Sequence, residues 1–196
     1  MNRNPIVLVH GLWDNPNSFN CLLRCLDAYN RDIYVPFLPS KGGKVSLNNL
    51  AENLNDYILD TLGDDQKIDL LGFSMGGLIS RIWIQKFAGS NRVKKFLSVG
   101  SPHNGTLSAQ LFPSYFFQGI SQMKIRSPLL LELNSDFSCL SKIECSSFFC
   151  NLDLLVVPGW SAVLPVGNLY SVPVLFHKEL ITNSKSLELL SRVLIG

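Results

Sequence analysis

The sequence predicts an α/β protein with a mostly parallel sheet of about six strands and helices on both faces. Short apolar runs typical of buried strands alternate along the chain with longer segments of helical periodicity. Such alternation implies right-handed crossovers between parallel strands. With 196 residues, 46% of them hydrophobic and 16% charged, the chain is long enough for one compact core. We therefore expect a single domain over residues 1–196.

The first half of the chain contains three clear strand signals. Residues 6–9 form a continuous apolar run, typical of a strand buried on both faces. Residues 33–38 read as a second strand, in which Pro36 indicates a sheet edge or a strand end. The third run, 68–71, leads into a glycine-rich turn. Helices are expected between these strands, over 19–29 and from Ser46 to Gly63.

The second half is less regular. A helix over 78–87 and a strand over 93–99 follow the glycine-rich turn, and regularity then fades between 106 and 145. We expect that segment to form a small cap or to line a groove, since the short chain leaves little room for a large lid. The remaining predicted elements are a short helix over 127–133 with proline in its first turn, strands over 146–150 and 172–176, and a terminal helix capped by Ser184.

Composition excludes several functions. The net charge is +2, and one basic cluster at 92–95 is too small to indicate a nucleic-acid partner. The N-terminal apolar run is too short for a signal peptide, and no run approaches the roughly 18 residues of a membrane span. We expect a cytoplasmic protein. Five cysteines without a C-x-x-C pair are expected to be free thiols, with no metal site: Cys21, Cys25, Cys139, Cys145 and Cys150.

The segment Gly72-Phe73-Ser74-Met75-Gly76 matches the G-x-S-x-G nucleophile elbow. This motif places a serine on a strained turn between a strand and a helix, with its hydroxyl clear of the sheet. The glycines on either side must lack bulk because the strand and the helix nearly collide there. The pattern alone is weak, so the chain must also supply an acid, a base and an oxyanion hole.

Three histidines are candidates for the base that accepts the serine proton. In enzymes that carry this elbow on a parallel sheet, the order along the chain is serine, acid, histidine. His10 precedes Ser74, and no acidic residue lies between Ser74 and His103. His177 therefore remains as the base. His10 is expected to brace the loop beside the substrate.

Four acidic residues lie between Ser74 and His177, and Asp153 is the best candidate for the acid. It follows a strand-like run and begins the apolar loop 154–158, where a carboxylate would need a partner such as an imidazole N–H. The alternative is a turn aspartate that caps the loop. The other three, in a helix and in polar turns, are expected to be solvated: Glu132, Asp136 and Glu144.

An oxyanion hole needs two backbone N–H groups aimed at the developing negative charge. One is expected from Met75, directly after the serine. The other is expected from Leu12, in the loop after the first strand. For substrate contacts we expect His10 and Phe73 near the serine, and Phe112 and Trp160 along an acyl-binding groove, although ordinary core packing is the alternative for each.

Three motifs carry a family resemblance: Val9-His10-Gly11, the segment from Gly72 to Gly77, and the segment from Gly100 to Thr106. By these residues the chain resembles small bacterial lipases and esterases of the α/β-hydrolase superfamily. The likeness covers residues 5 to about 110 and extends more loosely to the Asp153 segment. Phe73 departs from the pattern, since many relatives carry histidine there; the position packs against the sheet, so we expect little cost.

The resemblance implies a compact α/β-hydrolase and a serine hydrolase of carboxylic esters. Ser74, Asp153 and His177 would form its triad, with Leu12 and Met75 as oxyanion donors. The implied substrate is a small-molecule or lipid ester, with transient contact at a lipid interface and no cofactor. A thioesterase or acyltransferase with the same triad, and a non-catalytic member of the fold, remain alternatives. Acyl chain length and oligomeric state stay open.

Overall fold

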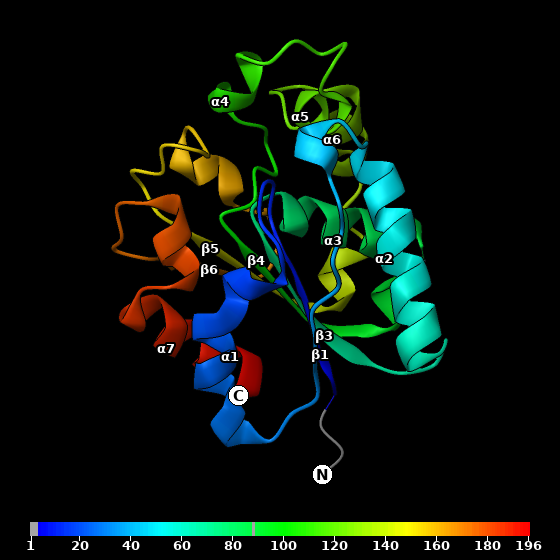
Figure 1. Ribbon diagram of the computed structural model, residues 1–196, viewed down its shortest axis with the longest axis vertical. Coiled ribbons are helices and arrows are strands. Elements are labelled where there is room, and N and C mark those ends of the chain that lie inside the picture. Colours follow the sequence, from blue (N-terminus) through cyan, green and yellow to red (C-terminus); the bar gives the residue numbers. More distant parts are fainter. Residues whose placement is uncertain (1–3, 88) are drawn as a thin grey trace.

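A computed structural model describes residues 4–87 and 89–196 (Figure 1). Its centre is a six-stranded sheet in the order β2-β1-β3-β4-β5-β6, in which every neighbouring pair is parallel. The predicted sheet is therefore confirmed in strand number and direction. The strands are β1 (Ile6–Val9), β2 (Ile33–Tyr34), β3 (Ile68–Phe73), β4 (Val93–Val99), β5 (Glu144–Phe149) and β6 (Asn168–Ser171).

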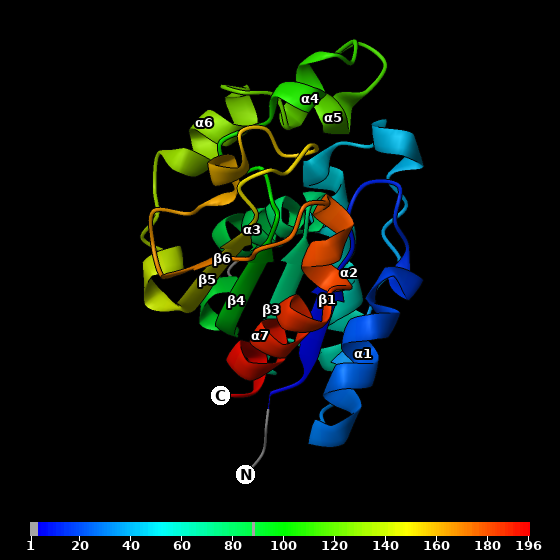
Figure 2. The same cartoon turned by 90° about the vertical axis from the view of Figure 1, so that its left-hand side faces the viewer.

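Helices cover both faces of the sheet (Figures 1 and 2). One face packs against α2 and α3, and the other packs against α1 and α7, which lie side by side. Alternate residues of β1 serve the two faces: Val7 and Val9 join the first cluster, whereas Ile6 and Leu8 join the second. The helices on these two faces are α1 (Asn20–Leu26), α2 (Leu47–Leu62), α3 (Met75–Lys86) and α7 (Ser184–Ile195).

Three short helices, α4 (Leu107–Gln110), α5 (Gln118–Gln122) and α6 (Pro128–Asn134), lie beyond the carboxyl ends of the strands. Hydrogen bonds anchor this segment to the rest of the molecule. The Gln122 side chain accepts the Leu47 amide at 2.6 Å, and the Leu107 amide donates to the Val157 carbonyl at 2.9 Å. The segment 106–145, for which the sequence predicted little regular structure, therefore covers the carboxyl ends of the strands and is hydrogen-bonded in place.

Several helix boundaries follow the predicted local chemistry. Ser46 caps α2 by accepting the Asn49 amide, and Gly63 ends that helix with φ 72°. Ser127 caps α6, with Pro128 in its first turn. The terminal helix differs, because its cap is Asn183 and not Ser184. The Asn183 side chain accepts the Lys185 amide at 3.0 Å, which makes it the preferred cap of the two.

Two strand boundaries were predicted wrongly. The second strand ends at Tyr34, and the Leu38 amide bonds to a histidine ring instead of a strand. The last strand is Asn168–Ser171, not 172–176. The Val172 amide still bonds to the Phe149 carbonyl, but Pro173 has no N–H to extend the ladder. His177 therefore lies beyond a loop, not at a strand end.

Within the described residues, no helix has both the length and the apolar character needed to cross a membrane. The five cysteines are all free, and they range from the exposed Cys25 to the buried Cys145 and Cys150. Burial raises the pKa of the Cys145 thiol to about 12. The Cys150 thiol, which is buried beside the Asp153 carboxylate, also has its pKa raised to about 12.

Candidate active site

Ser74 occupies the turn between β3 and α3 with φ 55° and ψ −125°. This backbone region costs a non-glycine residue on the order of 1–3 kcal/mol. The surrounding backbone leaves no room for bulk. A Cβ on Gly72 would lie 2.4 Å from the Gly77 Cα, and one on Gly76 would lie 2.1 Å from the Val9 carbonyl oxygen. The geometry of a nucleophile elbow is therefore present, with its glycines at the points of collision.

Asp153 and His177 form a buried hydrogen-bonded pair. The His177 Nδ1 lies 2.6 Å from the Asp153 Oδ2, and the two side chains are 7% and 2% exposed. The other carboxylate oxygen accepts the amides of Leu155 at 2.8 Å and Val156 at 2.9 Å. Burial by itself raises the pKa of the Asp153 carboxyl, but the bond to His177 and these two amides hold that pKa below its ordinary value.

The orientation of His177 leaves one nitrogen without a partner. Since a carboxylate only accepts hydrogen bonds, Nδ1 carries the proton toward Asp153 and Nε2 carries a lone pair. The Nε2 atom is buried and has no hydrogen-bond partner among the described residues. The ring packs on Phe73, with centroids 4.8 Å apart, and against Gly100, where a Cβ would lie 2.9 Å from Cε1. Its position is thus held from three sides.

Ser74 and His177 line the same cavity, which has a volume of about 420 Å³. Its wall comes from the loop after β1, the elbow, the α4–α5 segment and the loop after Asp153. Apolar side chains make up most of this wall, which suits a hydrocarbon ligand. The apolar lining residues are Leu12, Trp13, Phe73, Pro102, Ala109, Leu111, Phe112, Ile120, Met123, Leu155 and Val156.

Two backbone amides near Ser74 are free to bind an anion. Met75 is the first residue of α3, so its N–H lies at a helix N-terminus, where the dipole favours negative charge. Leu12 lies in the loop after β1 and lines the cavity. Among the described residues, neither amide has an acceptor.

The other two histidines are committed elsewhere. The His10 ring accepts the Leu38 amide at 3.1 Å and bonds the Gly11 carbonyl at 3.0 Å, so it braces the loop as expected. His103 bonds Ser98 at 2.6 Å. Burial lowers the pKa of His10 and holds that of His103 well below its ordinary value. Both are therefore neutral, and neither lines the Ser74 cavity.

The predicted substrate contacts divide into two groups. Phe73 and Phe112 line the Ser74 cavity, whereas His10 does not. Trp160 requires a correction, because it lies in a separate groove with Phe149 and Leu169 and is 65% exposed. The physical reason is the short helix Gly159–Ala162, which turns this side chain away from the cavity.

Sequence reasoning missed three polar residues at the site. Thr106 braces the acid loop, because its hydroxyl accepts the Val157 amide and donates to the Leu155 carbonyl, both at 2.9 Å. Asp14 and Lys178 form an ion pair, and both line the cavity. The sequence signal for this ion pair was that Asp14 lies two residues after Leu12 and that Lys178 directly follows His177.

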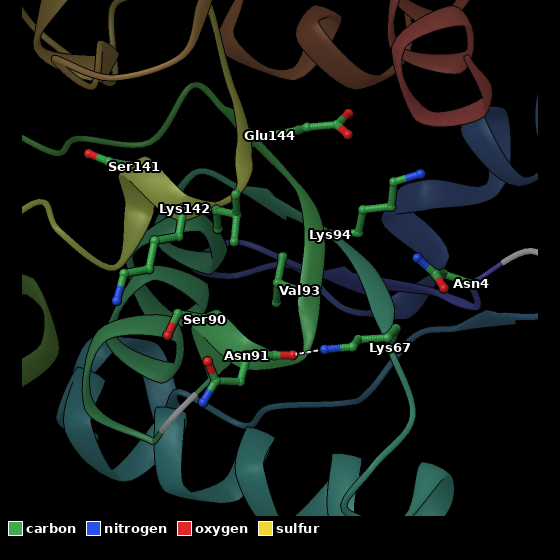
Figure 3. Close-up of a pocket in the computed structure, with 10 residues that line it drawn as sticks. Asn4, Lys67, Ser90, Asn91, Val93, Lys94, Ser141, Lys142 and Glu144 are labelled. Carbon is green, nitrogen blue, oxygen red and sulfur yellow. Dashed lines mark hydrogen bonds between the residues drawn. The ribbon is translucent and has the colours of Figure 1, made fainter.

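A second cavity, of about 860 Å³, lies at the opposite, amino-terminal end of the strands (Figure 3). Three lysines line it, but they do not converge. Lys67 bonds the Asn91 carbonyl, and Lys94 and Lys142 point away from one another (Figure 3). This cavity is larger than the first, but no histidine lines it. The smaller cavity is therefore the candidate active site.

Comparison with known proteins agrees with the fold. Aspergillus fumigatus lipase B superposes with a TM-score of 0.80 at 16% identity, over 99% of this chain and 53% of that one. The mature form of Bacillus licheniformis lipase BlEst2 superposes with a TM-score of 0.72 at 15% identity, over 98% of this chain and 92% of that one. At these identities the likeness concerns the fold alone.

Sequence comparison adds a relative and a family. The chain is 31% identical over 106 residues to the lysosomal thioesterase PPT2 homolog of Drosophila melanogaster, a stretch that covers 52% of this chain and 36% of the relative. The chain thus spans little more than a third of the length of that relative. The sequence model of the family described as alpha/beta hydrolase fold matches residues 4–135, more than half of the chain. The motif resemblance is confirmed: this protein belongs to the α/β-hydrolase fold family.

Proposed function

We propose that this protein is a serine hydrolase that cleaves carboxylic esters through an acyl-enzyme on Ser74. One observation carries the proposal. The Asp153–His177 bond of 2.6 Å leaves the His177 Nε2 unpaired at the cavity that also contains the strained Ser74. A serine becomes a nucleophile when a base accepts its proton and a third group orients that base.

In the first half of the reaction, the His177 Nε2 takes the proton from the Ser74 hydroxyl as Oγ attacks the ester carbonyl. Asp153 holds the imidazole in the required tautomer and stabilises the imidazolium that forms. The Leu12 and Met75 amides donate to the oxyanion of the tetrahedral intermediate. As this intermediate collapses, His177 gives its proton to the leaving alcohol and the acyl group remains on Ser74.

In the second half, water replaces the alcohol. His177 takes a proton from the water as its oxygen attacks the acyl-enzyme, and the same two amides hold the second oxyanion. The intermediate then releases the carboxylic acid, and His177 returns the proton to Ser74. With the ester and water, the groups of this chain supply every nucleophile, proton transfer and oxyanion contact in the cycle. We therefore propose no metal, nucleotide or redox cofactor.

The apolar wall of the cavity supports a substrate with a hydrocarbon acyl group. Phe112 and Met123, from the segment beyond the carboxyl ends of the strands, line the cavity together with Ser74 and Phe73. Burial of each methylene contributes about 0.8 kcal/mol, so such a wall rewards longer acyl chains. Lipid esters and simple alkyl esters both fit this description. Hydrolysis rates against acyl chain length, with and without an emulsified interface, separate them.

A thioesterase with the same triad is the second candidate. The name of the fruit-fly relative, lysosomal thioesterase PPT2 homolog, favours it. The triad itself does not choose between an alcohol and a thiol as leaving group, nor between water and another acceptor. Comparing the turnover of an oxygen ester and a thioester of the same acyl chain separates the two hydrolases. Adding an alcohol acceptor reveals an acyltransferase.

A fluorophosphonate probe tests the nucleophile directly, because it phosphonylates only an activated serine. We expect the wild type to label and the Ser74→Ala variant to stay unlabelled. Equal labelling of the two proteins would disprove the assignment of Ser74. A wild type that neither labels nor turns over any ester would favour the remaining alternative, a non-catalytic binding protein of this fold.

Two broader expectations accompany this proposal. A cytoplasmic location rests on the sequence, and the relative named above is lysosomal by its name. Cell fractionation with an antibody decides between the compartments. Folding as a single domain predicts one cooperative unfolding transition, which calorimetry and urea titration with two independent probes can test.

A further inference from the structure

An ion pair on the wall of the Ser74 cavity joins two distant loops. The Lys178 Nζ lies 2.5 Å from the Asp14 Oδ1, although 164 positions separate the residues. Both residues line the cavity. Asp14 belongs to the loop after β1, two positions after Leu12, and Lys178 directly follows His177. The pair therefore joins the loop that carries a free amide to the segment that carries the imidazole.

Each partner is also anchored within its own loop. The Asp14 Oδ1 also accepts the Ser18 hydroxyl at 2.8 Å, in the short helix η1 (Pro16–Phe19) that leads into α1. Lys178 lies in the short helix η7 (His177–Ile181), whose start is held by the Glu179 carboxylate. That carboxylate accepts the Leu175 and Phe176 amides at 2.9 and 3.0 Å. A bond between the two anchored partners can therefore set the distance between their loops.

The loop after β1 contains a strained residue. Trp13, between Leu12 and Asp14, has φ 60°, a left-handed conformation that is costly for a bulky residue. Its side chain is 63% exposed, so burial does not hold it in place. Strained backbone persists only where the surroundings impose it. The Asp14 amide closes the turn that contains Trp13 by donating to the Gly11 carbonyl at 3.3 Å, and the side-chain bonds of Asp14 to Ser18 and Lys178 hold the residue that closes it.

Lys178 also contacts the wall behind the imidazole. Its Nζ lies 5.4 Å from the centroid of the Phe73 ring, and that ring packs on His177. The ammonium is thus placed by a carboxylate on one side and an aromatic face on the other.

We propose that the Asp14–Lys178 ion pair is a clasp that positions the Leu12 amide relative to His177 for reaction at Ser74. Asp14 and Lys178 are then positioning residues, because they act through the groups beside them and not on the substrate. The inference rests on the proposed function. Its physical basis is that misplacing catalytic groups by a fraction of an ångström lowers kcat, since the transition state tolerates less displacement than the bound substrate.

The clasp is tested with Lys178→Met and Asp14→Asn, which remove one charge each at similar size. A matched control exists in the Lys86–Glu132 pair, which joins α3 to α6 at 2.8 Å with side chains 30% and 60% exposed, away from the cavity. Lys86→Met removes a comparable surface ion pair. For all variants, kcat and KM are measured with a soluble short-chain ester, together with the rate of fluorophosphonate labelling.

We expect each clasp variant to lower kcat and the labelling rate roughly fivefold with KM nearly unchanged, the scale of one exposed ion pair. The double variant should be no slower than either single one, because the two residues act as a unit. Lys178→Arg should retain most of the rate. Lys86→Met should match the wild type, and thermal unfolding of every variant checks that the fold persists.

Three outcomes overturn the clasp. The first is that both single variants, Lys178→Met and Asp14→Asn, have the same kcat and labelling rate as the control Lys86→Met. The second is a rise in KM alone, which would make Lys178 a substrate-binding residue. The third is additive losses in the double variant. Failure of the proposed function is distinct, since it requires Ser74→Ala to hydrolyse the ester or to label like the wild type.

Discussion

The Asp153 carboxylate and the His177 imidazole lie 2.6 Å apart, although they come from the loops after two different strands, β5 and β6. Both loops leave the same edge of the sheet because the two strands are parallel neighbours. The pair is buried, and the Asp153 carboxylate accepts hydrogen bonds from two amides of its own loop as well as from His177. Such an arrangement fixes the orientation of the histidine before any substrate arrives.

Replacing His177 separates the proposed base from the other histidines. We expect His177→Ala to lose activity by about a thousandfold or more, since removal of a triad member has effects of this size. His103→Ala is the control, and it should retain kcat per folded molecule. It should also unfold more easily, by roughly 1–3 kcal/mol, because Ser98 loses its buried partner. Steady-state kinetics and urea unfolding measure both effects. Equal loss of kcat in the two variants would contradict the assignment of the base.

Asp153→Asn tests the orienting role of the acid. We expect kcat to fall by about 10⁴-fold, because an amide can favour the wrong imidazole tautomer while the geometry stays nearly intact. KM should change little. Stopped assays over a range of ester concentrations give both constants. A variant with near wild-type kcat would instead support the alternative that Asp153 is a turn residue capping its loop.

The depressed pKa of Asp153 also predicts an acid-dependent loss of stability. The carboxyl ordinarily titrates at 3.8, and the folded protein holds its pKa below that value. The unfolded state therefore binds the proton first as pH falls, so the stabilisation is full above the unfolded pKa and is lost as pH drops through the folded one. Urea unfolding of the wild type and Asp153→Asn at neutral pH and between pH 4 and 2 measures this. The difference in unfolding free energy between them should shrink in acid; a constant difference would contradict the linkage.

The elbow glycines predict a steric cost. Gly76→Ala places a Cβ where it would lie 2.1 Å from the Val9 carbonyl oxygen, so α3 must move away from β1. We expect the free energy of unfolding to fall by about 1–3 kcal/mol or more, the usual scale of overpacking. Gly63→Ala is the control, because its Cβ would meet nothing within 4 Å and it tests only the strain of φ 72°. Urea titration compares them, and an equal or larger loss in Gly63→Ala would contradict the steric account.

The shape of the cavity predicts which substitutions change acyl-chain preference. Ala109 lines the cavity and is 3% exposed, so Ala109→Leu should fill space that the acyl chain uses. We expect kcat/KM for long acyl chains to fall about tenfold or more, with short chains little affected, since single methylene groups in a pocket change rates on this scale. Trp160→Ala, outside the cavity, is the control and should leave the profile unchanged. An equal loss at every chain length in Ala109→Leu would show that Ala109 does not meet the acyl chain.

Local patterns predicted the strands and helices well where one physical signal dominated. The apolar run of β1 and the Ser46 and Gly63 boundaries of α2 are as expected. Prediction was wrong where competing local options had similar strength. Asn183 and Ser184 are both good caps, and Pro173 stops the ladder of a run that otherwise reads as a strand. Which option prevails depends on hydrogen bonds to distant segments, and spacing along the chain does not contain them.

The residues of the candidate site also fall into those that the sequence could single out and those that it could not. Elimination along the chain singled out Ser74, Asp153 and His177, because the chemistry demands rare residue types in a defined order. Trp160 was placed wrongly, because a short helix turns its side chain away from the cavity. Aromatic residues are common in cores and grooves alike, so nothing in their type or spacing says which wall they join.

By itself, the sequence determined the class of sheet, the elbow and the order of serine, acid and histidine, because these depend on local backbone chemistry and on which residue types exist. Only the tertiary structure decided the orientation of the His177 ring, the wall of the cavity and the Asp14–Lys178 pair. Each of these joins segments that are far apart along the chain, and their approach is set by how the helices and loops pack on the sheet. The distances that govern chemistry arise from that packing.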